Sequence, residues 1–247
     1  MMSSHKNNGE NHELTPEQLW YFDCKGFVVV EGLFERELVE ELAAAAKTYE
    51  RPHYSQISCL LEKHSVFRKA MFHPAIDEIS RQFFGDYRIK TSVLVINPRK
   101  EKRKGGIEWP GWHQDADHGT HAYYATAWPC PLFQLRFFIA LSDVEEAKHG
   151  GLALYPGSHR TKLQWPFSRK VVPSGSEIPI FKKGDCLIMH HATLHTALPN
   201  ESDRDRVNVQ VLTTPLWIRS NEAEAASKEA LEALSEEHRK RIITEKW

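Results

Sequence analysis

Residues 184–200 read GDCLIMHHATLHTALPN and combine a turn, an apolar run and a histidine-rich segment. The turn signal Lys183-Gly184-Asp185 precedes the apolar run at 185–191, and Leu198-Pro199-Asn200 gives a second turn signal. A short apolar run between turn signals is typical of a buried strand. The stretch therefore predicts a strand that runs toward a turn, with His195 at the point where the chain reverses.

Further strand-like runs lie on both sides of this stretch. They are short, rich in β-branched or aromatic residues, and separated by turn signals such as Pro156-Gly157-Ser158. The runs cover residues 27–30, 92–96, 134–141, 151–155 and 207–213. We therefore expect the centre of the chain to be mainly β.

Helix signals gather at the two ends of the chain. Thr15 and Gln18 form a capping box, and Gly26 ends the short helix that they open. A second helix is predicted at 35–49, and the segment 221–247 is rich in helix-forming residues with a thin apolar stripe. Helices around a strand-rich centre predict a mainly β fold with flanking helices packed outside an antiparallel double-stranded roll.

The domain organisation follows from length and pattern. A chain of 247 residues is long enough to bury its own core, and it shows neither an internal repeat nor an inter-domain linker. We predict a disordered polar leader over residues 1–13 and a single domain over residues 14–247. Within that domain, a helical tail from about residue 221 should pack only lightly because its apolar stripe is thin.

Composition excludes several classes of partner. The chain has 32 basic and 33 acidic side chains, and this balance argues against affinity for nucleic acid or an anionic membrane. Its start lacks an apolar signal segment, and no window is long and apolar enough to span a membrane. Four scattered cysteines indicate a reducing compartment. We expect a soluble, cytoplasmic protein with a small-molecule partner and leave its oligomeric state open.

His113-Gln114-Asp115 is the candidate metal motif. Residues i and i+2 of a strand point to the same face, so His113 and Asp115 can reach one ion. His195 is the candidate third ligand, with His190 and His191 as neighbouring alternatives. Two imidazoles and one carboxylate on one side of a metal are typical of non-haem Fe(II) oxygenases, because the opposite side stays open for a chelating co-substrate and O2.

Longer segments resemble a known family. The segments that show the resemblance are TPEQL at 15–19, GFVVVEGLF at 26–34, WHQD at 112–115, GGLALYPGSH at 150–159 and the stretch 184–200. Together they look like the phytanoyl-CoA dioxygenase family over roughly residues 14–215. The resemblance implies a double-stranded β-helix, a cupin-like jelly roll that binds Fe(II) and 2-oxoglutarate.

The resemblance also implies roles for individual residues. His113, Asp115 and His195 match the iron ligands of the family, and Arg206 matches its co-substrate arginine. A return strand at 207–213 would bring Arg206 back beside the metal, where a guanidinium can hold the far carboxylate of 2-oxoglutarate in a bidentate manner. Arg204 is the alternative in this role.

Two positions depart from the family pattern. Leu152 stands where relatives often carry threonine, and Ala197 stands where serine is common. Both changes remove hydroxyl groups that would contact the co-substrate. The hydrogen bonds could instead come from three residues: Gln134, Arg136 and Thr196.

Two segments bear on the substrate. Residues 98–106 are strongly basic and form either a solvated loop or a lid that attracts an anionic substrate. The aromatic residues Tyr123, Tyr124 and Trp128 follow the metal motif and either wall the pocket or belong to the core.

The sequence thus predicts an Fe(II)- and 2-oxoglutarate-dependent dioxygenase. With O2 as second co-substrate, it would oxidise a small molecule, and hydroxylation of an unactivated C–H bond is the expected outcome. Two alternatives stay open at this point. One is a cupin-type metalloenzyme that does not use 2-oxoglutarate, and the other is a non-catalytic jelly-roll binding module.

Overall fold

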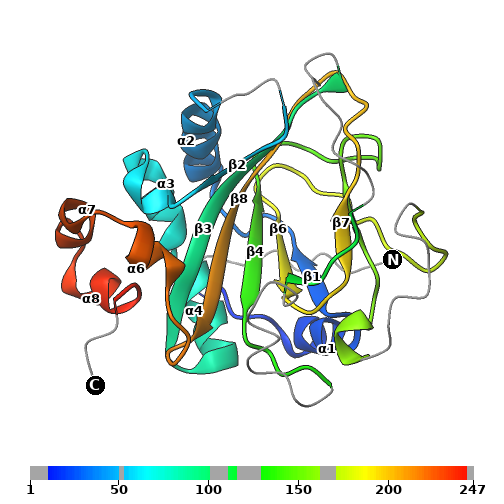
Figure 1. Ribbon diagram of the computed structural model, residues 1–247. Coiled ribbons are helices and arrows are strands. Elements are labelled where there is room, and N and C mark those ends of the chain that lie inside the picture. Colours follow the sequence, from blue (N-terminus) through cyan, green and yellow to red (C-terminus); the bar gives the residue numbers. More distant parts are fainter. Residues whose placement is uncertain (1–10, 50–52, 101–110, 116–128, 162–170, 244–247) are drawn as a thin grey trace.

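Two antiparallel sheets face each other in the computed structural model, which describes residues 11–49, 53–100, 111–115, 129–161 and 171–243 (Figure 1). The strands of the large sheet are, in spatial order, β1 (Phe27–Val30), β6 (Cys186–His190), β4 (Leu135–Ala140), β8 (Arg206–Pro215), β3 (Tyr87–Asn97) and β2 (Ser55–Ser58). The small sheet pairs β5 (Leu152–Leu154) with β7 (His195–Ala197). The architecture confirms the predicted mainly β fold with flanking helices, a double-stranded β-helix or cupin-like jelly roll.

Helices cover the outer face of the large sheet. Figure 1 shows α2, α3 and the C-terminal helices on one side of this sheet and β7 on the other. The α-helices with described bounds are α1 (Pro16–Lys25), α2 (Arg36–Lys47), α3 (Ser65–Met71), α4 (Pro74–Phe84), α6 (Asn221–Ala225), α7 (Lys228–Glu232) and α8 (Glu236–Lys240). Short 3-10 turns lie at η1 (Leu60–Glu62) and η4 (Ser158–Arg160).

The core has layers because successive strand residues point to opposite faces. Phe137 belongs to the main cluster under the helices, together with Leu42 and Phe67. Its neighbour Phe138 belongs to a smaller cluster between the two sheets, together with Leu187. The inner faces of the two sheets therefore form a second apolar layer, and the buried residues of this layer come from strands and not from helices.

Helix α1 shows how local sequence signals act here. Thr15 and Gln18 form the predicted capping box, and Gly26 ends the helix with a φ of 85°. A Cβ atom at Gly26 would lie 2.3 Å from the Thr193 hydroxyl, so both the backbone conformation and the close approach require glycine. The Gly26 carbonyl also accepts hydrogen bonds from His190 N–H and the Thr193 hydroxyl, which fixes α1 to the segment after β6.

The last described residues form three short helices beside β3, where a helical tail is expected from about residue 221. The prediction of light packing is wrong, because Leu234 and Ile242 are buried and Glu222 is fully buried. The Glu222 carboxylate accepts hydrogen bonds from the backbone N–H groups of Leu61 and Ser92. The Glu222 side chain thus connects the tail to the sheet through hydrogen bonds, and the apolar stripe of the tail does not predict this contact.

The N-terminal leader is only partly visible. Residues 1–10 of the leader predicted at 1–13 lie outside the described residues. His12 donates its backbone N–H to the Glu78 carboxylate on α4 at 2.6 Å, so the described end of the leader lies against a helix. Among the helices that the structure describes, none has the length and apolar character needed to cross a bilayer.

Candidate metal centre

Three candidate ligands meet where two distant segments run side by side. His113 and His195 form an isolated antiparallel bridge, in which each backbone N–H donates to the other carbonyl at 3.1 and 3.0 Å. Asp115 N–H donates to His191 O at 3.0 Å and anchors the last residue of the motif. The backbone pairing therefore brings the 113–115 segment next to the start of β7.

This geometry differs in two details from the predicted one. His113 lies in a single bridge and not in a regular strand, and Asp115 lies outside any strand at the end of the described segment 111–115. His195 opens β7, so one turn (residues 191–193) comes before it, in addition to the predicted turn that follows β7 and leads to β8. Both side chains still reach one point, because the bridge sets His113 and His195 directly opposite each other.

The ligand atoms of His113, Asp115 and His195 all lie within 4.8 Å of one another. Asp115 Oδ1 is 3.8 Å from Nε2 of each imidazole. In the described part of the chain, no other group of three or more His, Cys, Asp or Glu side chains comes this close. The structure thus brings the three predicted ligands together.

Backbone carbonyls orient both imidazoles. His113 Nδ1 lies 2.7 Å from Gly111 O, and His195 Nδ1 lies 2.9 Å from Thr193 O. A carbonyl only accepts, so each Nδ1 carries the proton and each Nε2 is left with its lone pair. The lone pairs point at the space next to Asp115 Oδ1, as metal ligation requires.

The electrostatics favour the metal-binding protonation states. Burial raises the pKa of Asp115, but Arg136 and the imidazoles of His195 and His113 outweigh it and leave this pKa below its ordinary value. Burial lowers the pKa of His195 to about 4, although Asp115 opposes this shift. The carboxylate is therefore ionised and His195 is neutral near pH 7. Imidazole and carboxylate ligands together suit Fe(II).

The neighbouring histidines serve other purposes. His190 and His191 stack with ring centroids 4.7 Å apart, and His190 Nδ1 accepts the N–H of Ala192. Neither is part of the three-residue group around Asp115. The alternatives for the third ligand therefore do not fit the geometry, whereas His195 does.

A polar chain leads away from Asp115 along the inner face of the large sheet. Arg136 Nη2 lies 2.8 Å from Asp115 Oδ2, and its Nη1 donates to Gln210 Oε1 at 2.9 Å. Gln210 in turn donates to Asn208 Oδ1 at 3.0 Å. The sequence reasoning missed Gln210 and Asn208. Their alternation with valine in 206–210 was the available signal for a polar row on one face of a strand.

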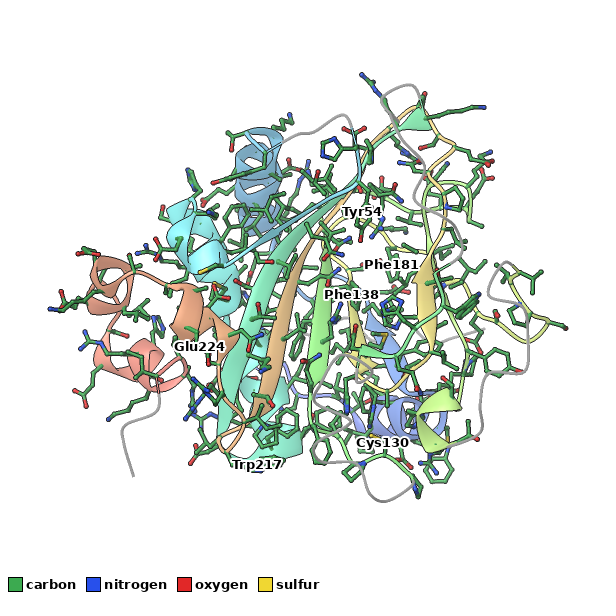
Figure 2. The ribbon with its side chains drawn as sticks, in the orientation of Figure 1. Tyr54, Cys130, Phe138, Phe181, Trp217 and Glu224 are labelled. Atoms are coloured by element: carbon green, nitrogen blue, oxygen red, sulfur yellow. The ribbon has the colours of Figure 1, made fainter. Side chains whose placement is uncertain are left out.

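Arg206 continues this row at the start of β8. Its side chain is buried, and its Nε has no hydrogen-bond partner among the described residues. Burial lowers the pKa of Arg206, and Tyr54 partly opposes the shift (Tyr54 is labelled in Figure 2). A buried cation without a charged partner is costly, so this site is suited to an anion.

Arg206 lines a pocket between the two sheets. The other lining residues are mostly apolar, and Phe138 and Phe181, both labelled in Figure 2, are among them. The full lining comprises Phe138, Ala140, Ser142, Val144, Gly151, Leu152, Phe181, Leu187, Arg206, Val207 and Asn208. Leu152 therefore faces the pocket, and the missing hydroxyl at this position leaves an apolar wall.

Two further candidates differ in their fit to this pocket. Thr196 lies next to His195 on β7, so its side chain points to the opposite face, where its hydroxyl accepts the Gly111 N–H at 3.0 Å. The expectation that Thr196 contacts the co-substrate does not fit this placement. Gln134 is buried two residues before Arg136, and its carbonyl accepts His191 N–H.

Arg204, the alternative to Arg206, lies at the surface. It pairs with Glu145, and more than two fifths of its side chain is exposed. Most of the basic segment 98–106 and all of Tyr123, Tyr124 and Trp128 lie outside the described residues. Trp112 is fully buried against Ala153 and Leu198, as expected for a packing residue.

The sequence matches a family model over residues 22–208, and the family is phytanoyl-CoA dioxygenase (PhyH). The match covers most of the chain, including the three ligands and Arg206. The chain belongs to the PhyH family. PhyH proteins are Fe(II)- and 2-oxoglutarate-dependent oxygenases, so the chain is an enzyme of this class. No curated protein matches the sequence significantly.

Solved structures of other members of this enzyme class share the fold. HygX from Streptomyces hygroscopicus, crystallised with nickel and 2-oxoglutarate, has a TM-score of 0.69 and 17% identity, over 84% of this chain and 89% of HygX. The α-ketoglutarate-dependent epimerase SnoN has a TM-score of 0.64 and 20% identity, over 81% and 82% of the two chains. The carbocyclase SnoK has a TM-score of 0.64 and 19% identity, over 85% and 88%. At these identities the likeness concerns the fold.

Proposed function

We propose that this PhyH protein oxidises a small molecule by hydroxylating an unactivated C–H bond, with His113, Asp115 and His195 as ligands of Fe(II). The observation that carries the proposal is the pairing of two features on one inner surface. A three-residue ligand group stands at one end of the polar row, and a buried guanidinium without a charged partner among the described residues stands at the other.

These two features suit the two ends of 2-oxoglutarate. The keto-acid end would chelate the metal, and Arg206 would hold the far carboxylate in a bidentate manner. When bound, Fe(II) and 2-oxoglutarate supply the oxidising power for attack on a C–H bond, with O2 as the oxidant. The residues of the chain orient these groups and exclude water from them.

Three more residues take proposed roles in this site. Arg136 lies against Asp115, and Gln134 precedes it by two positions, so both are candidates for contacts near the keto-acid end. Arg206 remains the main co-substrate residue. We do not include Thr196, because its hydroxyl is already bonded to Gly111 on the opposite face of β7.

Structurally similar proteins support a small-molecule substrate. HygX has been crystallised with hygromycin B, and SnoN with nogalamycin RO. For this chain we propose a small substrate and cytoplasmic action. The basic segment 98–106 would favour an anionic substrate. Since SnoN is an epimerase and SnoK a carbocyclase, the reaction outcome is the part of the proposal that most needs direct measurement.

Succinate release and O2 uptake with Fe(II) test the reaction class. Wild-type protein should convert 2-oxoglutarate to succinate, and mass spectrometry of candidate substrates should show the addition of one oxygen atom. Asp115→Ala should abolish both signals, because the ligand group loses its only carboxylate. Full activity of Asp115→Ala would remove the metal assignment.

The two alternative functions give different results. A cupin-type metalloenzyme that does not use 2-oxoglutarate would bind metal yet be insensitive to Arg206→Ala. A non-catalytic binding module would contain no iron after anaerobic reconstitution. The proposed dioxygenase requires both iron uptake and an effect of Arg206→Ala on 2-oxoglutarate binding.

A further inference from the structure

Asp115 uses its two carboxylate oxygens differently. Oδ1 lies 3.8 Å from Nε2 of His113 and 3.8 Å from Nε2 of His195. Oδ2 lies 2.8 Å from Arg136 Nη2, and the side chains of both partners are largely buried. One oxygen therefore faces the metal position, and the other faces a guanidinium.

Arg136 is itself held in place. Its second terminal nitrogen donates to Gln210 Oε1, and Gln210 donates to Asn208. The guanidinium carbon stands 5.6 Å from the centre of the Phe138 ring. Arg136 also lies on β4, which pairs with β6 on one side and β8 on the other, so its backbone belongs to the centre of the large sheet.

We propose that Arg136 is a positioning residue that holds Oδ2 of Asp115, so that only Oδ1 is available to bind the metal. This inference rests on the proposed function and deepens it. A carboxylate with two free oxygens can bind a metal through both. By holding one oxygen, Arg136 keeps Asp115 a one-oxygen ligand, and the side of the metal opposite the three ligands stays open for 2-oxoglutarate and O2.

The contact differs from an ordinary stabilising ion pair. A buried ion pair is seldom more stabilising than apolar residues of the same volume, so stability alone gives little reason to place one here. Groups that contact metal ligands orient them, and their removal commonly weakens metal binding or activity by about 10- to 100-fold. The guanidinium fork forms an ion pair with Asp115 Oδ2 while it donates a hydrogen bond to Gln210, and a lysine cannot make both contacts with the same fixed geometry.

Four variants separate positioning from stability. Arg136→Met removes the contact, Arg136→Lys keeps the charge, and Gln210→Leu frees one arm of the fork. The matched control is Arg241→Met, because Arg241 is another largely buried arginine that contacts a carboxylate, Asp77, at 3.2 Å and lies in the C-terminal segment. Circular dichroism and thermal melting would establish that each variant folds.

The main measurement is the absorption spectrum of the Co(II)-substituted protein without 2-oxoglutarate, which reports the number and arrangement of ligands. Arg136→Met should change this spectrum and weaken 2-oxoglutarate binding by about tenfold or more. Arg136→Lys and Gln210→Leu should give smaller changes in the same direction. Arg241→Met should melt at a lower temperature and keep the wild-type spectrum and affinity.

Unchanged spectra and 2-oxoglutarate affinities in Arg136→Met and Gln210→Leu would overturn the inference while leaving the proposed function intact. A spectral change that occurs only after 2-oxoglutarate is added would also overturn it, since Arg136 would then act on the co-substrate. If wild-type protein binds neither Co(II) nor 2-oxoglutarate, the proposed function fails and the inference fails with it. If Arg136→Met does not fold, Gln210→Leu decides.

Discussion

Arg206 is a buried guanidinium whose Nε has no hydrogen-bond partner in the described part of the chain, and this makes it costly in the unliganded protein. Arg206→Met should therefore raise the free energy of unfolding of the unliganded protein by about 1 kcal/mol or more. The same change should weaken 2-oxoglutarate binding by at least about tenfold, because charge-assisted hydrogen bonds to the far carboxylate are lost. Urea unfolding and calorimetric titration measure the two effects.

Arg204→Ala is the control for the opposite effects of Arg206→Met on stability and on 2-oxoglutarate binding. Arg204 lies two residues away, but its side chain is partly exposed and pairs with Glu145. Exposed ion pairs contribute about 0–1 kcal/mol, so neither stability nor 2-oxoglutarate affinity should change much. An equal loss of affinity in both variants would mean that general positive charge attracts the co-substrate and that Arg206 has no specific role.

The four cysteines should differ in reactivity. Cys24 is exposed, whereas the other three are buried. Burial raises the pKa of Cys59 and of Cys130 to about 11 and also raises that of Cys186. Since the thiolate is the reactive form, iodoacetamide at about pH 8 should modify Cys24 first and the others only on unfolding. Peptide mass mapping checks this order, and Cys24→Ser should lack the fast phase. Rapid labelling of Cys59 in the folded protein would contradict its burial.

At the scale of elements, Glu222 connects α6 to η1 and β3. Burial raises the pKa of Glu222 above its ordinary value, and hydrogen bonds from Leu61 and Ser92 only partly oppose this shift. A raised pKa in the folded protein means that protonation favours folding. This contribution is complete below the unfolded pKa of about 4.3 and is lost as pH rises through the folded value.

Glu222→Gln tests this linkage. Glutamine does not titrate, so the wild type should lose stability relative to the variant as pH rises from about 4 toward neutrality. Urea unfolding of both proteins over this range measures the difference at each pH. Glu229→Gln on the neighbouring helix α7 is the control, because the structure assigns no buried hydrogen bond to its carboxylate. A constant difference between wild type and Glu222→Gln would contradict the raised pKa.

The elements differ in how far the sequence predicts them. Strands with apolar runs, such as β1 and β6, were predicted within a residue or two, because local composition and turn signals coincide there. The patterns in the sequence do not predict helices α3 and α4. The ring of a histidine caps each of them, His64 for α3 and His73 for α4. The sequence places the short strand β7 in a turn, because three residues are too few to show an alternation.

The residues of the candidate site also differ in how far the sequence predicts them. The spacing of a known motif predicts His113, Asp115, His195 and Arg206 as site residues, and the structure gathers the first three around one point. The chain from Arg136 to Asn208 depends on the register between β4 and β8, which a sequence does not state. Thr196 illustrates the opposite error, since one step along β7 moves its side chain to the other face.

At the scale of the whole molecule, the proposed ligands should stabilise the fold. Ligands that bind only the folded state at about 100 times their Kd add about 2.7 kcal/mol. For a chain of this size, that gain corresponds to a rise in Tm of roughly 5–11 °C. We expect this rise with Co(II) and 2-oxoglutarate together under anaerobic conditions, followed by differential scanning fluorimetry.

Asp115→Ala should abolish the rise in Tm, whereas Arg206→Met should abolish only the part that 2-oxoglutarate adds to that of Co(II). The addition of succinate in place of 2-oxoglutarate should give a smaller rise, because succinate lacks the keto oxygen for chelation. A full rise in Asp115→Ala would place metal binding elsewhere in the molecule.

The position of β8 in the sheet has a consequence for synthesis. This strand comes late in the chain, yet it lies in the middle of the large sheet between β4 and β3. Until residues 206–215 leave the ribosome, two strands of the nascent protein keep unpaired edges, and such edges invite aggregation. A premature stop codon before this point should therefore yield an aggregation-prone product.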